Sequence, residues 1–308
     1  MLPSLNLLLA GLSQRLSSCR LRKLILRGFD QMSRTKKIRD SVSIVGADPR
    51  RITALAQEDA IGGISGPGRW LVAEYQPTSL FSLKASQATS SVGVSLIIPT
   101  PYAVKMAFVD AAFRAGLTDQ DCGEFLKSLA GIDLRIAPTH VAVVTNTFVK
   151  VRQESRDDDP LRPYGSTIAY RELVFLGGNW RWAFDIARGD DVLALRLVQL
   201  APQINYIGKR GSFIQFIGPL YRKSQLEPGF TQPINSDEAW TPPQRSHIRQ
   251  LDDFGPDADL RSLSSFTSVK PKREKHRRFV ATVIPAGVTN TGPGFSEYRS
   301  QLSLRGRL

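Results

Sequence analysis

A strand that runs directly into a well-marked helix is the feature that most constrains the fold of this chain. The apolar run 94–98 is followed by prolines that end it. Thr100 can cap a helix, Pro101 suits its first turn and Gly116 suits its end, which predicts a helix over 101–115. The apolar positions of this segment recur at helical spacing and form one face: Val104, Ala107, Phe108, Ala111 and Ala112. This face is expected to pack on a protein core.

Further elements follow the same rules. Thr118 can cap a second helix over 119–130, Gly131 ends it, and a third helix is predicted at 190–200. Strands are predicted at 70–75, 94–98, 141–151, 166–176, 180–186, 213–217 and 279–284. The odd positions of 141–151 are Val and Thr, which predicts a buried face. The opposite face carries His140, Asn146, Phe148, Lys150 and Arg152.

A short basic loop, Gly208-Lys209-Arg210-Gly211-Ser212, precedes the strand at 213–217. Two glycines leave backbone amides accessible, and two cations lie between them, so the loop suits a phosphate-rich partner. The alternative is an ordinary surface turn of the same composition.

The net charge of +13 is unevenly distributed. Residues 1–40 and 268–278 carry twelve of these thirteen charges, so the rest of the chain is nearly neutral. Basic runs of this kind bind phosphate with weak sequence specificity. Lys272 and Arg273 lie in the second run, 270–278, and whether this run instead pairs with the acidic residues near 252–259 is left open by the sequence.

The composition predicts one folded domain at 68–220, a basic N-terminal extension and linker at 1–67, and a C-terminal extension at 221–308 in which 285–308 is irregular. Met32 is an alternative start, which would make 1–31 an extension. Cys19 and Cys122 are far apart, which excludes a Cys-x-x-Cys zinc site and fits a reducing, cytoplasmic location. The apolar run 2–12 is too short to span a bilayer, so no membrane partner is expected.

The order of strand, helix, long hairpin, helix, glycine-rich loop and strand approximates a β-α-β-β-α-β unit, so the predicted class is α+β, ferredoxin-like. The junction Ile98-Pro99-Thr100-Pro101-Tyr102-Ala103-Val104-Lys105-Met106-Ala107 resembles the first strand-to-helix junction of the CRISPR-associated RAMP proteins. The loop 208–212 resembles their glycine-rich loop. The hairpin 141–176, with its loop at 153–165, resembles the thumb of the subunit that caps the 5′ end of the guide RNA in type I-like (Cascade) complexes.

This resemblance covers about residues 69–218. It implies a non-catalytic RNA-binding subunit that grips the 5′ handle of the guide RNA and places its thumb against a neighbouring backbone subunit. The implied partners are guide RNA, other subunits of the complex and, as a further candidate, target DNA. Residues expected at the RNA are Lys105, Phe148, Lys150, Arg152, Gly208, Lys209, Arg210, Gly211, Ser212, Lys272 and Arg273.

Each of these residues also has a structural interpretation. Lys105 can be a solvated side chain on an otherwise apolar helix. Phe148, Lys150 and Arg152 suit base stacking and backbone contact, or an edge strand whose charges discourage aggregation. The run 157–159 of three Asp is interpreted as a solvated loop, so no metal and no cofactor is expected.

Two other functions remain open. A metal-independent endoribonuclease of the same fold would need a base, an acid and a cation, and His140 with Tyr164 or Tyr170 and Lys150 is the candidate set. A structural RNA-binding protein unrelated to CRISPR would use the basic ends alone.

Overall fold

The computed structural model describes residues 68–85, 92–154, 164–186, 191–209, 211–236, 241–264 and 267–300, all within the second of the chain's two units, residues 56–308. These residues form a mixed α+β fold with many antiparallel strand pairs, which confirms the predicted α+β class. The helices are α4 (Pro101–Arg114), α5 (Asp119–Ala130), α6 (Asp191–Leu200) and α7 (Leu260–Leu263). The strands are β1 (Trp70–Pro77), β2 (Leu83–Lys84), β3 (Val92–Gly93), β4 (Ser95–Leu96), β5 (Leu134–Ala137), β6 (Val141–Glu154), β7 (Tyr164–Gly177), β8 (Trp180–Asp185), β9 (Ile214–Phe216), β10 (Tyr221–Lys223), β11 (Gln232–Pro233), β12 (His247–Phe254), β13 (Arg277–Ile284), β14 (Ala286–Gly292) and β15 (Phe295–Ser300).

The central sheet has the order β10-β1-β8-β5, with β9 also paired to β1. Strand β1 lies in its middle and is buried on both faces. Its odd residues, such as Leu71 and Tyr75, join the main core with the helices, whereas Trp70 and Val72 join a smaller core around Phe230 on the other face. The sheet is therefore covered on both sides.

The two helices after β4 begin and end where the sequence predicts. The Thr100 hydroxyl accepts from the Ala103 amide at 3.2 Å, and the Thr118 hydroxyl accepts from the Asp121 amide at 3.1 Å. Each bond satisfies an amide that has no partner inside its own helix. Val104 and Phe108 of α4 are fully buried, as the predicted apolar face requires.

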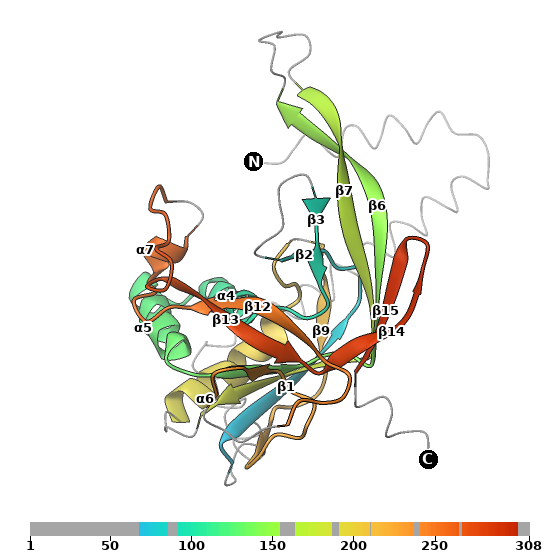
Figure 1. Ribbon diagram of the computed structural model, residues 1–308. Helices are drawn as coiled ribbons and strands as arrows, with labels where there is room; N and C mark the ends of the chain where they lie inside the picture. Colours follow the sequence, from blue (N-terminus) through green and yellow to red (C-terminus); the bar gives the residue numbers. More distant parts are fainter. Residues whose placement is uncertain are drawn as a thin grey trace, which may run out of the picture. The chain divides into compact units, whose positions relative to one another are not determined.

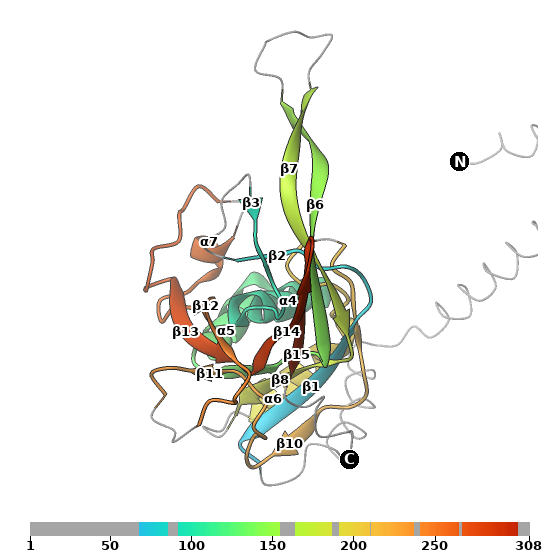
Figure 2. The same ribbon diagram turned by 45° about the vertical axis from the view of Figure 1, so that its right-hand side comes forward.

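Strands β6 and β7 form a long antiparallel hairpin inserted between β5 and β8. It projects beyond the rest of the described chain (Figures 1 and 2). Its inner half lies in a second sheet of order β14-β15-β6-β7-β3. The odd face of β6 is not buried as predicted: Thr145 is exposed and Val149 is 38% exposed, because the outer half of the hairpin extends away from the core.

The C-terminal segment is more ordered than the sequence predicts. Residues 286–300 form the strands β14 and β15, which extend the sheet of the hairpin, so the expectation of irregular structure at 285–308 is wrong for this part; residues 301–308 lie outside the described chain. Strands β12 and β13 pair along their full length and lie against α4 (Figure 1). Leu251, Phe254 and Ile284 belong to the same core as β1 and α4.

Candidate nucleic-acid interface

The glycine-rich loop is a tight turn that requires its glycines. Gly208 and Gly211 have φ values of +69° and +98°, in the left-handed region that side chains with a Cβ disfavour. Lys209 lies between them, and its carbonyl accepts from the Ser212 amide at 3.1 Å. Ser212 is buried, and the predicted Arg210 lies outside the described residues.

Hydrogen bonds hold this turn against the segment that follows β1. The Ser79 hydroxyl donates to the Gly211 carbonyl at 2.9 Å and accepts from the Phe213 amide at 2.8 Å. A Cβ added at Gly208 would lie 3.0 Å from the Leu83 side chain. The turn is thus fixed in place close to β2.

Lys84 of β2 and Lys209 of the turn line one cavity, and Arg171 of β7 is close enough for its charge to act on Lys209; we call these three cations the basic cluster. Burial lowers the pKa of Lys209, and the nearby charges of Arg171 and Lys84 lower it further. Cations that repel one another in this way favour binding of an anion between them. The sequence predicts Lys209 only, because Lys84 and Arg171 lie in unremarkable local contexts and come together through folding.

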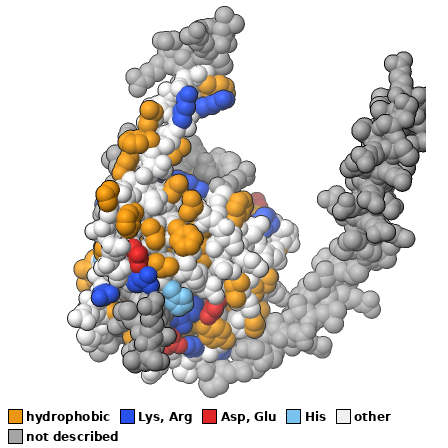
Figure 3. Space-filling view, turned by 90° about the vertical axis from the view of Figure 1, so that its right-hand side faces the viewer, with side chains coloured by type: hydrophobic (Ala, Val, Ile, Leu, Met, Phe, Trp, Pro, Cys, Tyr) orange, Lys and Arg blue, Asp and Glu red, His pale blue; other side chains and the backbone are white. Residues whose placement is uncertain are grey.

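The outer hairpin carries the predicted residues Phe148, Lys150 and Arg152 on one face. All three are exposed, and Phe148 is 74% exposed. The register pairs Phe148 with Tyr170, whose ring it meets edge-on at 5.3 Å between centroids. Lys and Arg side chains lie near the outer end of the hairpin and hydrophobic ones along it (Figure 3). The hairpin therefore presents aromatic, apolar and cationic groups together.

Lys105 does not lie at any surface. Its side chain is fully buried, its ammonium donates to the Ile132 carbonyl at 3.0 Å, and it lies 2.8 Å from the Asp253 carboxylate. The expectation that Lys105 contacts RNA is therefore wrong, as is its interpretation as a solvated side chain. A lysine buried on an apolar helix face needs a carboxylate beside it. For Lys105 this carboxylate is Asp253, which is 148 positions away in the sequence.

The basic run 270–278 divides into two parts. Lys272 and Arg273 are exposed on a turn, where Arg273 lies over the Phe279 ring at 5.4 Å and beside Glu274. Arg277 and Arg278 instead pair with the buried carboxylates at the end of β12, Asp252 and Asp253. The acidic and basic segments thus do pair in part, and Lys272 and Arg273 remain available to an external phosphate.

The residues considered for RNA cleavage lie apart. His140 adjoins the inner end of β6, while Tyr170 pairs with Phe148, eight residues along the strand from His140. At about 3.3 Å per residue this separation is roughly 26 Å, and Lys150 is farther still. The hairpin therefore does not bring His140 together with Lys150, Tyr164 or Tyr170. The run 157–159 lies outside the described residues.

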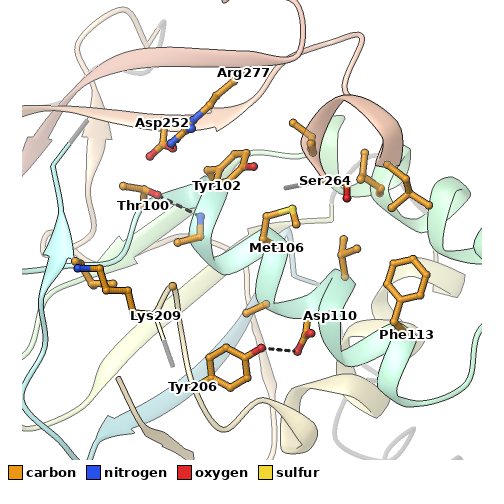
Figure 4. Close-up of a pocket in the computed structure, with 18 of the residues that line it drawn as sticks. Thr100, Tyr102, Met106, Asp110, Phe113, Tyr206, Lys209, Asp252, Ser264 and Arg277 are labelled. Atoms are coloured by element: carbon orange, nitrogen blue, oxygen red, sulfur yellow. Dashed lines mark hydrogen bonds and ion pairs between the residues drawn. The ribbon is translucent and has the colours of Figure 1, made fainter. Parts of the chain in front are cut away.

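A cavity of about 910 Å³ lies beside the basic cluster (Figure 4). Its walls come from α4, α7, β2, the end of β12 and the turn at 206–209. Lys84 and Lys209 line one part, and Tyr102, Met106 and Phe113 of α4 supply aromatic and apolar surface. The Tyr206 hydroxyl donates to the Asp110 carboxylate inside it at 3.3 Å. The cavity thus extends from Lys84 and Lys209 of the basic cluster to the side chains of α4.

Comparison with known proteins gives similarity at low sequence identity. No protein-family model matches the chain. The CRISPR-associated protein Cas5 of Archaeoglobus fulgidus is 22% identical over 107 residues, which cover 35% of this chain and 47% of that protein. The chain thus matches about half the length of this relative.

Two solved structures were also found. A CRISPR protein from Archaeoglobus fulgidus aligns with 75% of this chain and 91% of its own, at 11% identity and a TM-score of 0.34. A chain of a CRISPR RNA-guided surveillance complex aligns with 70% of this chain and 88% of its own, at 15% identity and a TM-score of 0.35. Separately, no helix in the described ranges is long and apolar enough to cross a membrane. The sequence match to Cas5 confirms that this chain resembles the CRISPR-associated RAMP proteins.

Proposed function

We propose that this chain is an RNA-binding subunit of a multi-subunit CRISPR effector complex and that it holds the 5′ handle of the guide RNA. The observation that carries the proposal is that Lys84 and Lys209 of the basic cluster line one cavity beside a glycine-rich turn, in a chain similar to Cas5. Single-stranded RNA needs cations for its phosphates and apolar surface for its bases, and both occur here.

The proposed frame is a ferredoxin-like domain. A β-α-β-β-α-β unit in an antiparallel sheet places its fourth strand beside its first, then its third and its second. The order β9/β10, β1, β8, β5, with α4 and α5 after β1 and α6 after β8, supports this assignment. In this frame the turn at 208–212 precedes the last strand.

The hairpin β6–β7 is the proposed thumb. It is inserted between the second and third strands of the frame, and its outer half carries exposed apolar side chains, among them Phe148, Tyr164 and Ile168. Solvent exposure of such groups is unfavourable in an isolated protein and favours contact with another surface. We assign Tyr164 and Ile168, near the tip, to a neighbouring protein subunit, and Phe148, Lys150 and Arg152 on the same face to the RNA.

The chain is proposed to hold the RNA without cleaving it. General acid–base cleavage requires its groups within hydrogen-bond reach of one phosphate. The separation of His140 from Lys150 and Tyr170 along β6 supports a binding role over the endoribonuclease alternative.

The test is the salt dependence of binding to single-stranded RNA. Each phosphate contact contributes about 0.7 to the slope of log affinity against log salt concentration. Lys84→Ala and Lys209→Ala are expected to weaken binding and to lower this slope by about 0.7 each. Lys127→Ala, which removes an exposed lysine of α5, is the control and should leave both unchanged. Equal affinities and slopes for all four proteins would contradict the proposal.

A further inference from the structure

The cavity beside the basic cluster contains a carboxylate that is held in place from one side. Asp110 Oδ2 accepts from Arg114 Nε at 2.9 Å and from the Tyr206 hydroxyl at 3.3 Å. Arg114 is itself fixed by donating to the Gln203 carbonyl at 3.0 Å. Within the described chain no hydrogen bond to Asp110 Oδ1 is found, and the side chain is 40% exposed. The geometry leaves Oδ1 able to accept from a ligand in the cavity.

The walls around this carboxylate suit a flat aromatic ligand. Tyr102, Met106 and Phe113 of α4 line the cavity together with Asp110 (Figure 4). Phe113 is 41% exposed although it is a large apolar side chain. Aromatic rings and the polarisable methionine sulfur both pack well on the face of a nucleobase.

The cations at the rim identify the kind of ligand. Lys84 and Lys209 line the same cavity, and Lys209 is three residues after Tyr206, so at most about 11 Å of extended chain separates their Cα atoms. A phosphate held at the basic cluster would thus have its base within reach of the cavity. A purely apolar ligand or an apolar peptide side chain would leave these cations and Asp110 without a role.

We propose that this cavity receives one unpaired base of the bound RNA and that Asp110 selects a base with an exocyclic amino group. This inference rests on the proposed function and adds a specificity-determining residue to it. A carboxylate accepts hydrogen bonds and donates none; adenine, cytosine and guanine each offer it an amino donor, whereas uracil has no amino group and only the N–H of its ring at N3. The hydroxyl of Tyr206 keeps the carboxylate oriented toward the cavity.

The test compares two RNA heptamers of uridine that differ in one central nucleotide. One contains adenosine and the other purine riboside, which is adenosine without its amino group. The wild-type chain is expected to bind the adenosine heptamer about tenfold more tightly, as measured by fluorescence anisotropy. Asp110→Leu removes the acceptor at similar size and is expected to abolish this preference, while Asp191→Leu, the same change at an exposed position far along the chain, retains it.

A second variant tests the cavity independently, in case the first variant does not fold. Met106→Trp fills the cavity without altering charge, and it is expected to reduce the preference for adenosine while leaving the salt dependence of binding unchanged. An undiminished preference in both Asp110→Leu and Met106→Trp would overturn the inference.

The failure of this inference is distinguishable from failure of the proposed function. Equal wild-type affinity for both heptamers, combined with weaker binding by Lys209→Ala, would overturn the base pocket and leave the RNA-binding role intact. RNA affinity that Lys84→Ala and Lys209→Ala do not alter would overturn both.

Discussion

Lys105 and Asp253 form an ion pair of 2.8 Å that joins α4 to the last residues of β12 and is closed to solvent on both sides. The exposed fractions of the two side chains are 0% and 6%. Asp253 also accepts from Arg278 of β13 at 2.8 Å, so one carboxylate holds two cations from two elements. This ion pair joins the paired strands β12 and β13 to α4, the first helix of the proposed RNA-binding frame.

Loss of Lys105 is expected to destabilise the fold. Lys105→Met leaves a buried carboxylate with only one cation, and breaking such a pair costs about 3 kcal/mol or more. Urea denaturation measures this cost, with Lys127→Met as the exposed control, expected to lie within about 0.5 kcal/mol of wild type. If both variants unfold at the same urea concentration, Lys105 is not paired as described.

His247 is expected to make the stability sensitive to mild acid. Burial lowers its pKa from the ordinary value of 6.5, the more so beside Arg249, although the hydrogen bond between Nδ1 and the Ala286 carbonyl opposes the effect. Because the folded pKa is below the unfolded one, the unfolded state binds more protons between the two values. Stability therefore falls as the pH drops below about 6.5.

The measurement is the midpoint of urea denaturation between pH 7.5 and pH 5. His247→Gln should show a smaller loss on acidification than wild type, whereas His140→Gln, at an exposed position, should follow wild type. A pH dependence that His247→Gln leaves unaltered would show that another group is responsible.

Lys272 and Arg273 are expected to act on RNA through charge alone. Both are exposed on the turn before β13, and Arg273 lies beside Glu274, which is also exposed. The double variant Lys272→Ala/Arg273→Ala should lower the slope of log affinity against log salt by about 1.4 without changing base preference. Arg277→Ala is unsuitable as a control, because Arg277 pairs with the buried Asp252. Arg249→Ala, at an exposed position, is the control instead. If Arg249→Ala lowers the slope as much as the double variant does, the turn has no specific role in binding.

Phe148 is expected to contribute to binding and not to the fold. It is 74% exposed, so Phe148→Ala should alter the free energy of unfolding by no more than about 0.5 kcal/mol. Because a base is expected to stack on it, the substitution should cost about 1–3 kcal/mol of RNA affinity. Phe175→Ala, on the opposite face of the same hairpin, is the matched control. An RNA affinity unchanged by Phe148→Ala would contradict this role.

The elements with local signals could be predicted from the sequence. Thr100 and Thr118 cap their helices as expected, because a helix end depends on a few neighbouring residues. The pairing of β6 with β7 also follows from alternation and loop position. The general α+β class and the turn at Gly208 and Gly211 follow from the same kind of reasoning.

Features that depend on distant partners could not be predicted. Strand β14 contains the poor strand formers Gly287, Asn290 and Gly292, and it is held by its pairing with β15, which in turn pairs with β6. Lys105 was assigned to RNA because nothing near it in the sequence reveals Asp253. The sequence near Lys84 and Arg171 likewise does not reveal that folding brings them close to Lys209. The hydrogen bond from Tyr206 to Asp110 also depends on distant residues.

The identity of the RNA bound in the cell tests the central claim most directly. The chain would be purified from its host with its bound partners, and the RNA would be sequenced, in parallel with a Lys84→Ala/Lys209→Ala strain. We expect small RNAs that share one constant 5′ segment, several co-purifying proteins, and much less RNA from the variant strain. RNAs with no common 5′ end, or equal amounts of RNA from both strains, would contradict the account.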